Sequence, residues 1–146
     1  MKIFVAGATG AIGKRLVPLL GSAGHQVFGM TRQPGHMDQL TAAGAVPVVA
    51  DALDAAAVMQ AVIKARPDVV VHELTAISGL RDLKHFDREF ALTNRLRTEG
   101  TRNLLVAAKA AGAHRFIAQS YSGWPNVRTG GPREDRAGSA GSQPAP

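Results

Sequence analysis

The hydrophobic positions of the chain fall into short apolar runs that are separated by stretches with helical spacing. The apolar runs are rich in β-branched residues and occupy residues 2–6, 26–31, 45–50, 68–73 and 115–120. They are too continuously apolar to alternate between two environments, which is typical of parallel strands that helices cover on both faces. We therefore predict five parallel strands.

The stretches with helical spacing lie at about residues 11–23, 36–43, 55–66 and 86–111. Asp54 is expected to cap the third helix. The fourth helix is expected to direct five residues inward, Leu92, Leu96, Leu104, Leu105 and Ala108. Strands that alternate with helices predict an α/β fold with a doubly wound parallel sheet and right-handed crossovers. By the Rossmann winding rule, the strand order is 3-2-1-4-5.

The composition changes near the C-terminus. Residues 126–146 contain four glycines and three prolines, and their only hydrophobic residues are Val127 and three alanines. Such a segment cannot bury enough apolar surface to offset the entropy of ordering it. We therefore expect one Rossmann domain over residues 1–125 and a flexible tail rich in Gly, Pro and Ser over residues 126–146.

The charge balance favours small anionic ligands over nucleic acid. The chain has 17 Lys and Arg against 11 Asp and Glu, a formal net charge of +6, and only 5% aromatic residues. Its basic residues are spread out instead of forming a block, so nucleic-acid binding is not expected. The histidines lack the spacing of metal ligands, so no metal site is predicted.

Cysteine usage and hydropathy bear on the compartment. The chain has no cysteine, which excludes disulfides and thiolate chemistry and fits a reducing cytoplasm. No apolar run approaches the roughly 20 residues that span a bilayer, and the N-terminus lacks the apolar segment of a secretion signal. We expect a cytoplasmic protein with no membrane partner.

Residues 7–13 read GATGAIG and directly follow the first predicted strand. At this place in a βα unit, the free N–H groups and the dipole of the helix attract a pyrophosphate. We assign the tight turn to Gly7, the close approach of a phosphate to Gly10 and the packing of the helix to Gly13. The alternative is a glycine-rich turn without a ligand.

The end of the second strand bears on which dinucleotide is bound. An acidic residue that binds the ribose of NAD is expected there, but the sequence has Thr31 and Arg32. A guanidinium at this place can hold a 2′-phosphate by paired hydrogen bonds. NADP is therefore favoured over NAD, the alternative being a solvated surface arginine.

The third strand also ends in candidate ligand contacts. Asp51 could accept a hydrogen bond from the amino group of adenine, while the backbone of Ala52 and Leu53 closes around the ring. Alternatively, Asp51 only terminates the strand. For Asp54, the capping role is preferred.

The fourth strand runs into Leu74, Thr75 and Ala76, which are expected over the same crevice. His72, at the end of this strand, is interpreted as a histidine with a local partner instead of a catalytic base. The predicted dinucleotide site thus draws on the ends of four strands.

Residues 1–128, which contain the residues named above, resemble the N-terminal half of the extended or atypical short-chain dehydrogenase/reductases, often labelled NAD-dependent epimerase/dehydratase. The resemblance rests on five segments in order, GATGAIG, DALD, VVHELTA, NRLRTEGTRNLLVAAKAAG and RFIAQSYSGWP. It implies an oxidoreductase or sugar-nucleotide epimerase, with a hydride moving to or from C4 of a nicotinamide. It also makes residues 86–111 a candidate dimer surface, because the family often pairs through long helices.

The resemblance further implies roles for individual residues. It implies the same cofactor contacts for the three glycines, Arg32 and Asp51 that the residues themselves suggest. It also implies that Asn94 supports the active-site region. The additional loop contacts are Thr9, Ala11 and Ile12, the last two through the first helical N–H groups. The catalytic serine of the family corresponds to Ser120 or Ser122, and we favour Ser120.

One departure from the family concerns proton transfer. Members use a Tyr-x-x-x-Lys pair, in which the lysine lowers the pKa of the tyrosine. Here Tyr121 is the only tyrosine, Pro125 stands four residues later, and no lysine follows Lys109. We expect a shortened member of the family that lacks the substrate-binding half. The alternatives are a non-catalytic NADP-binding sensor or interaction module, or an inactive truncated fragment.

Overall fold

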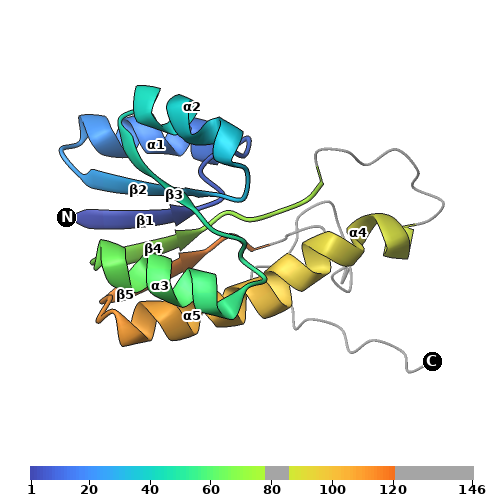
Figure 1. Ribbon diagram of the computed structural model, residues 1–146. Helices are drawn as coiled ribbons and strands as arrows, with labels where there is room; N and C mark the ends of the chain where they lie inside the picture. The colour runs from blue at the N-terminus through green and yellow to red at the C-terminus, as the bar shows by residue number, and fades with distance from the viewer. Residues whose placement is uncertain (78–85, 121–146) are drawn as a thin grey trace, which may run out of the picture.

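A computed structural model describes residues 1–77 and 86–120 of the chain. Its centre is one sheet of five parallel strands in the order β3-β2-β1-β4-β5 (Figure 1). The strands are β1 (Lys2–Ala6), β2 (Gln26–Thr31), β3 (Ala45–Val49), β4 (Val69–His72) and β5 (Arg115–Ala118). Both the doubly wound α/β fold and the predicted strand order are confirmed.

Helices cover both faces of the sheet, with α1 and α2 on one side and α3 and α5 on the other (Figure 1). The bounds are α1 (Gly13–Ser22), η1 (Pro34–His36), α2 (Met37–Ala42), α3 (Ala55–Ala65), α4 (Phe86–Arg95), η3 (Leu96–Gly100) and α5 (Thr101–Ala110). The segment η3 is a π-helical turn, which joins α4 to α5 without a break. The fourth predicted helix is therefore one rod with a local change in winding.

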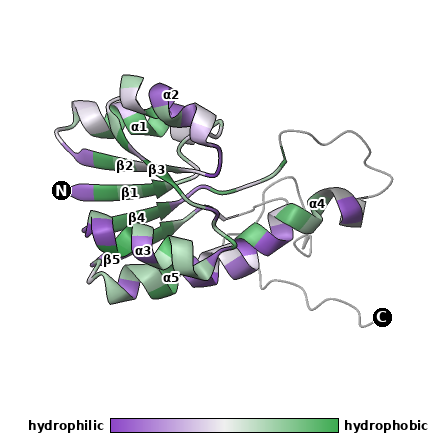
Figure 2. Cartoon of the chain, in the orientation of Figure 1, coloured by the Kyte–Doolittle hydropathy of each residue, from purple (hydrophilic) through white to green (hydrophobic). Residues whose placement is uncertain are grey.

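Two apolar clusters fill the spaces between the sheet and its helices. Under α3 and α5 the cluster includes Phe4, Val58, Val70 and Leu104, all fully buried. The cluster on the opposite face is built from Val5, Val17, Val27 and Leu40 among others. The central strands β1 and β4 are largely hydrophobic along their length (Figure 2), as expected of strands that are covered on both faces.

The inward face of the long helix differs from the predicted one. Leu104 is buried, but Leu105 is 51% exposed and Leu92 is 36% exposed. Thr93 and Gly100 take inward positions instead. A π turn holds more residues than an α turn, so it rotates the face of the helix that follows it. The regular spacing assumed from the sequence therefore misplaces Leu105, which follows the π turn, whereas at Leu92, which precedes the turn, Thr93 takes the inward place.

Some of the sequence predictions concern residues that the structure does not describe. The tail predicted over residues 126–146, and the candidates Tyr121 and Ser122, lie outside the described residues. Within residues 1–77 and 86–120, no helix is long and apolar enough to cross a membrane.

Candidate dinucleotide-binding site

The glycine loop joins β1 to α1 at the carboxyl edge of the sheet. Gly7 has a φ of 92°, a left-handed conformation that favours glycine. A Cβ on Gly7 would lie 2.8 Å from the carbonyl group of Glu73, and one on Gly13 would lie 2.6 Å from the carbonyl group of Ala8. Backbone packing therefore requires glycine at both ends of the loop.

Gly10 has a different environment. It is exposed, and an added Cβ would approach only the carbonyl oxygen of Gly7, at 3.2 Å. Within the part of the chain that the structure describes, the N–H groups of Ala11 and Ile12 have no hydrogen-bond acceptor. The first turn of α1 contains no acidic residue. The loop thus offers an open surface and free donors at the positive end of a ten-residue helix, which suits a pyrophosphate.

The end of β2 lies beside this loop because β2 pairs with β1. Thr31 is buried, and its hydroxyl accepts a hydrogen bond from the Gln33 N–H at 3.2 Å. This contact shapes the turn that carries Arg32. Arg32 itself is exposed, and no carboxylate occupies the turn over residues 31–35. Thr31 therefore has a structural role in the turn, while the exposed Arg32 guanidinium has no hydrogen-bond or ion-pair partner within residues 1–77 and 86–120.

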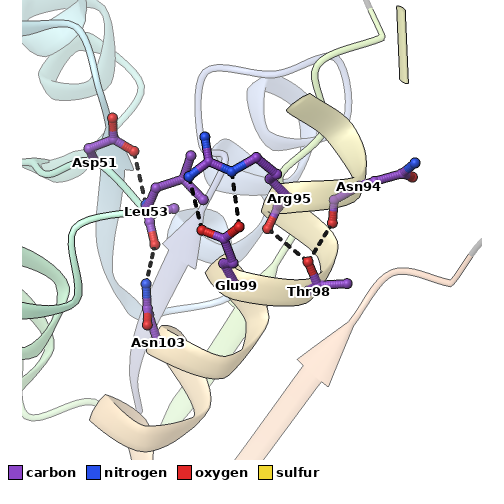
Figure 3. A network of polar contacts seen from close by, with 8 residues as sticks. Asp51, Leu53, Asn94, Arg95, Thr98, Glu99 and Asn103 are labelled. Atoms are coloured by element: carbon purple, nitrogen blue, oxygen red, sulfur yellow. Dashed lines mark hydrogen bonds and ion pairs between the residues drawn. The ribbon is translucent and has the colours of Figure 1, made fainter. Parts of the chain in front are cut away.

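The end of β3 forms a tight turn that helix α5 supports (Figure 3). Asp51 Oδ1 accepts the Leu53 N–H at 2.9 Å, and the carbonyl oxygen of Ala52 accepts a hydrogen bond from Asn103 Nδ2 at 2.9 Å. Asp54 accepts the N–H groups of Ala56 and Ala57, so its predicted capping role is confirmed. Asn103 is a residue that sequence reasoning missed, since nothing near it in the sequence signals a contact 51 residues away.

The same close view includes an exposed ion pair on the long helix. Arg95 and Glu99 form a two-point contact, with Arg95 Nε 2.9 Å from Glu99 Oε1. This pair lies between the helix and the Asp51 turn, whereas the Asn94 side chain points away from that turn (Figure 3). The pair raises the pKa of Arg95 and lowers that of Glu99 through their mutual hydrogen bond.

The end of β4 is held by side chains from the long helix. His72 is buried, with Nε2 2.9 Å from Thr101 Oγ1, and its Nδ1 accepts the Leu74 N–H at 3.1 Å, so the prediction of a local partner is confirmed. Burial is the largest effect on His72 and lowers its pKa. A backbone hydrogen bond at Leu96 raises this pKa, and the charge of Arg97 lowers it. Burial also raises the pKa of Glu73, whose Oε2 atom is buried and has no hydrogen-bond partner among the residues that the structure describes.

Leu74, Thr75 and Ala76 follow directly and are half-buried. Ala76 donates its N–H to Thr93 Oγ1 at 3.0 Å, a contact that explains why a threonine takes an inward place on α4. Sequence reasoning missed Thr93 as well.

A cavity of about 280 Å³ opens where β4 and β5 end. Its lining consists of His72, Leu74, Arg97, Thr101, Ala118, Gln119 and Ser120. Ser120, the favoured catalytic serine, is therefore beside the end of β4. Asn94 is exposed and does not line this cavity; Arg97, almost one turn later, does, and it donates a hydrogen bond to the Gln119 carbonyl at 3.1 Å.

A family model described as NAD(P)H-binding matches residues 7–139. The chain belongs to this NAD(P)H-binding family. The matched region starts at the first glycine of GATGAIG and includes every candidate cofactor contact named above. The Rossmann assignment from the sequence is thus confirmed at the level of the family.

Among curated proteins, the chain is 51% identical over 122 residues to a 3-diazoavenalumate denitrifying reductase from a Streptomyces species. The alignment covers 84% of this chain but 38% of that reductase. A shorter alignment, 39% identical, covers 49% of this chain and 24% of an uncharacterized protein from Schizosaccharomyces pombe. The chain spans well under half the length of these relatives.

Solved structures give the same picture of a partial match. A short-chain dehydrogenase/reductase superfamily protein from Agrobacterium tumefaciens with bound NAD is 29% identical, with a TM-score of 0.60. The alignment covers 81% of this chain and 32% of that one. A UDP-glucose-4-epimerase from Stenotrophomonas maltophila with bound NAD shares the fold, with a TM-score of 0.73 at 20% identity, over 94% of this chain and 42% of that one.

Proposed function

We propose that the chain binds a nicotinamide dinucleotide across the carboxyl edge of its sheet and forms the cofactor-binding half of a reductase. The observation that carries this proposal is the glycine loop. Gly7 and Gly13 are required by backbone packing, whereas the exposed Gly10 leaves room in front of helical N–H groups that have no acceptor among the described residues. The loop therefore fits a pyrophosphate, which a side chain at position 10 would obstruct.

We propose NADP(H) as the preferred cofactor. Arg32 stands at the end of β2 where a carboxylate would select the 2′-hydroxyl of NAD, and its guanidinium is exposed. Paired hydrogen bonds from a guanidinium suit the 2′-phosphate of NADP. Asp51, Ala52 and Leu53 would enclose the adenine ring, and residues 74–76 would receive the opposite end of the dinucleotide. A bound nicotinamide supplies a hydride.

The chemistry of the acceptor distinguishes two substrate classes. A carbonyl group takes one hydride and one proton, so a carbonyl substrate needs a proton donor near Ser120. Replacing a diazonium group by hydrogen takes one hydride and releases N2, with no proton consumed. The 51% identity to a reductase named for a diazo compound favours the second class, and the resemblance to dehydrogenases and epimerases favours the first.

Calorimetric titration of the purified chain with NADPH and with NADH tests the proposal. We expect NADPH to bind more tightly. Tighter binding of NADH would overturn the argument from Arg32, and binding of neither dinucleotide would overturn the functional interpretation of the loop. A carbonyl compound and an aryl diazonium salt, each with NADPH and a protein-free control, then separate the substrate classes. Binding without turnover of either would favour the non-catalytic NADP-binding module.

A further inference from the structure

The β4 loop, defined as residues 73–77, packs against the first residue of the glycine loop and is hydrogen-bonded to the end of β1. The Glu73 N–H donates to the carbonyl oxygen of Ala6 at 2.9 Å. The sheet order places β2 and β3 on one side of β1, and β4 and β5 on the other. A dinucleotide whose adenine half lies beside Arg32 therefore reaches the β4 loop with its nicotinamide half.

Two side chains hold alternate N–H groups of the β4 loop. The Leu74 N–H donates to His72 Nδ1 at 3.1 Å, and the Ala76 N–H donates to Thr93 Oγ1 at 3.0 Å. Between them, the N–H of Thr75 has no acceptor among the residues that the structure describes. The two anchors thus fix the loop and leave one backbone donor available to a ligand.

The hydrogen bonds of His72 determine its tautomer. Thr101 donates its hydroxyl hydrogen to the carbonyl oxygen of Arg97 at 2.6 Å, so its oxygen offers only a lone pair to His72 Nε2, 2.9 Å away. Nε2 therefore carries the hydrogen. Nδ1 must then be unprotonated, which is what it needs to accept the Leu74 N–H.

A second proton on the imidazole would have to enter at Nδ1, where it would face the Leu74 N–H as one donor against another. The charged groups around the ring do not favour that proton strongly. Arg97 on the long helix opposes it, while Glu73, the next residue along the chain, carries a carboxyl group whose pKa is raised. On the β5 side, Phe116 makes an edge contact with the imidazole, with ring centroids 6.5 Å apart, and the cavity lining there consists of the uncharged Ala118, Gln119 and Ser120.

We propose that His72 and Thr93 are positioning residues that hold the β4 loop ready for the nicotinamide half of the dinucleotide, and that protonation of His72 releases the loop and weakens cofactor binding. The part that concerns the cofactor rests on the proposed function. The part that concerns the loop does not, because its contacts are present in the free protein.

Nitrogen NMR of the imidazoles in the ligand-free chain tests the loop alone. We expect His72 to carry its hydrogen on Nε2 and to titrate below the ordinary histidine value of about 6.5. A hydrogen on Nδ1 at neutral pH would overturn the proposed anchor. This measurement stands whether or not a dinucleotide binds.

NADPH titrations of the wild type and of His72→Asn between pH 5 and 8 test the coupling. Asparagine keeps an acceptor near the Nδ1 position but does not titrate. Below the pKa of His72, we expect the wild-type dissociation constant to rise by up to about tenfold per pH unit more than that of the variant. The titration of NADPH itself is common to both proteins. The exposed His114→Asn serves as the matched control and should follow the wild type.

Variants of Thr93 test the second positioning residue. Thr93→Ser keeps the acceptor for Ala76 and should bind NADPH within about twofold of the wild type, whereas Thr93→Val should bind about tenfold more weakly. Thr98→Val, an exposed position on the same rod, controls for the loss of a hydroxyl.

If the wild type binds NADPH and the NADPH affinity of His72→Asn falls equally in acid, the coupling is wrong. If the wild type binds neither NADPH nor NADH at pH 7.5, the proposed function fails together with the cofactor part of this inference.

Discussion

Gly13 packs against the carbonyl group of Ala8 so closely that a Cβ on Gly13 would lie 2.6 Å from it. Gly13→Ala must therefore displace backbone, and we expect it to lower the free energy of unfolding by about 2 kcal/mol or more. Urea denaturation measures this. Gly21→Ala is the matched control, because nothing lies within 4 Å of its added Cβ and alanine stabilises a helix by about 1 kcal/mol. Equal stability of the two variants would contradict the packing role of Gly13.

Gly10→Ala should separate binding from folding. Its added Cβ meets only the Gly7 oxygen, at 3.2 Å, a contact that the exposed loop can relax by a few tenths of an ångström. We expect a loss of stability below about 1 kcal/mol but a loss of NADPH affinity of about tenfold or more, since the methyl group takes the space of a phosphate. Thermal denaturation and calorimetry on the same sample provide the two values. Unchanged NADPH affinity would remove the main support for a phosphate at this loop.

Arg32→Ala should reduce the preference for NADPH over NADH. A hydrogen bond to a charged group contributes roughly 1.5–3 kcal/mol, so we expect NADPH affinity to fall by about 10- to 100-fold. NADH affinity should change much less, because NADH lacks the 2′-phosphate. Lys64→Ala, which removes one positive charge from the exposed end of α3, is the control for net charge. A parallel loss for both dinucleotides would refute a specific role in 2′-phosphate recognition.

The strands and their order could be predicted because the information is local and redundant. Each strand is a continuous apolar run, and the alternation with helices leaves few chain paths. The inward face of the long helix differs from the prediction at Leu105, which follows a π turn that shifts the helical phase, and at Leu92, where Thr93 lies inward and accepts a hydrogen bond from Ala76. Neither feature has a signature in the spacing of hydrophobic residues.

The candidate site likewise has one part that could be predicted from the sequence and one part that could not. The glycine loop could be predicted from seven consecutive residues because the spacing of its glycines and its place after the first strand are visible in the sequence itself. The supports of the site could not, since Thr101 lies 29 residues from His72 and Asn103 lies 51 residues from Ala52. Such pairs become visible only when the fold brings the long helix against the strand ends.

Glu73→Gln should stabilise the chain at neutral pH. Burial raises the pKa of Glu73, and its Oε2 atom has no hydrogen-bond partner in the described part of the chain, so the folded state favours the protonated form. The wild type therefore has its full relative stability below the unfolded pKa and loses it as the pH rises through the folded value. We expect the variant to have a higher melting temperature at pH 7 and a nearly equal one at pH 4. A constant difference at both pH values would show that charge burial is not the cause.

Asn103→Ala should weaken binding at the adenine end of the site more than at the nicotinamide end. The Asn103 amide holds the carbonyl oxygen of Ala52 at 2.9 Å, and this contact joins helix α5 to the turn proposed to enclose adenine. Loss of this hydrogen bond should lower the free energy of unfolding by about 1 kcal/mol and loosen the turn. Affinity for 2′,5′-ADP should therefore fall, while affinity for reduced nicotinamide mononucleotide should stay near the wild-type value. Calorimetry with the two half-ligands checks this, with the exposed Gln60→Ala on α3 as control. Equal losses for both half-ligands would indicate a general loosening of the fold instead of a role for Asn103 at the adenine end.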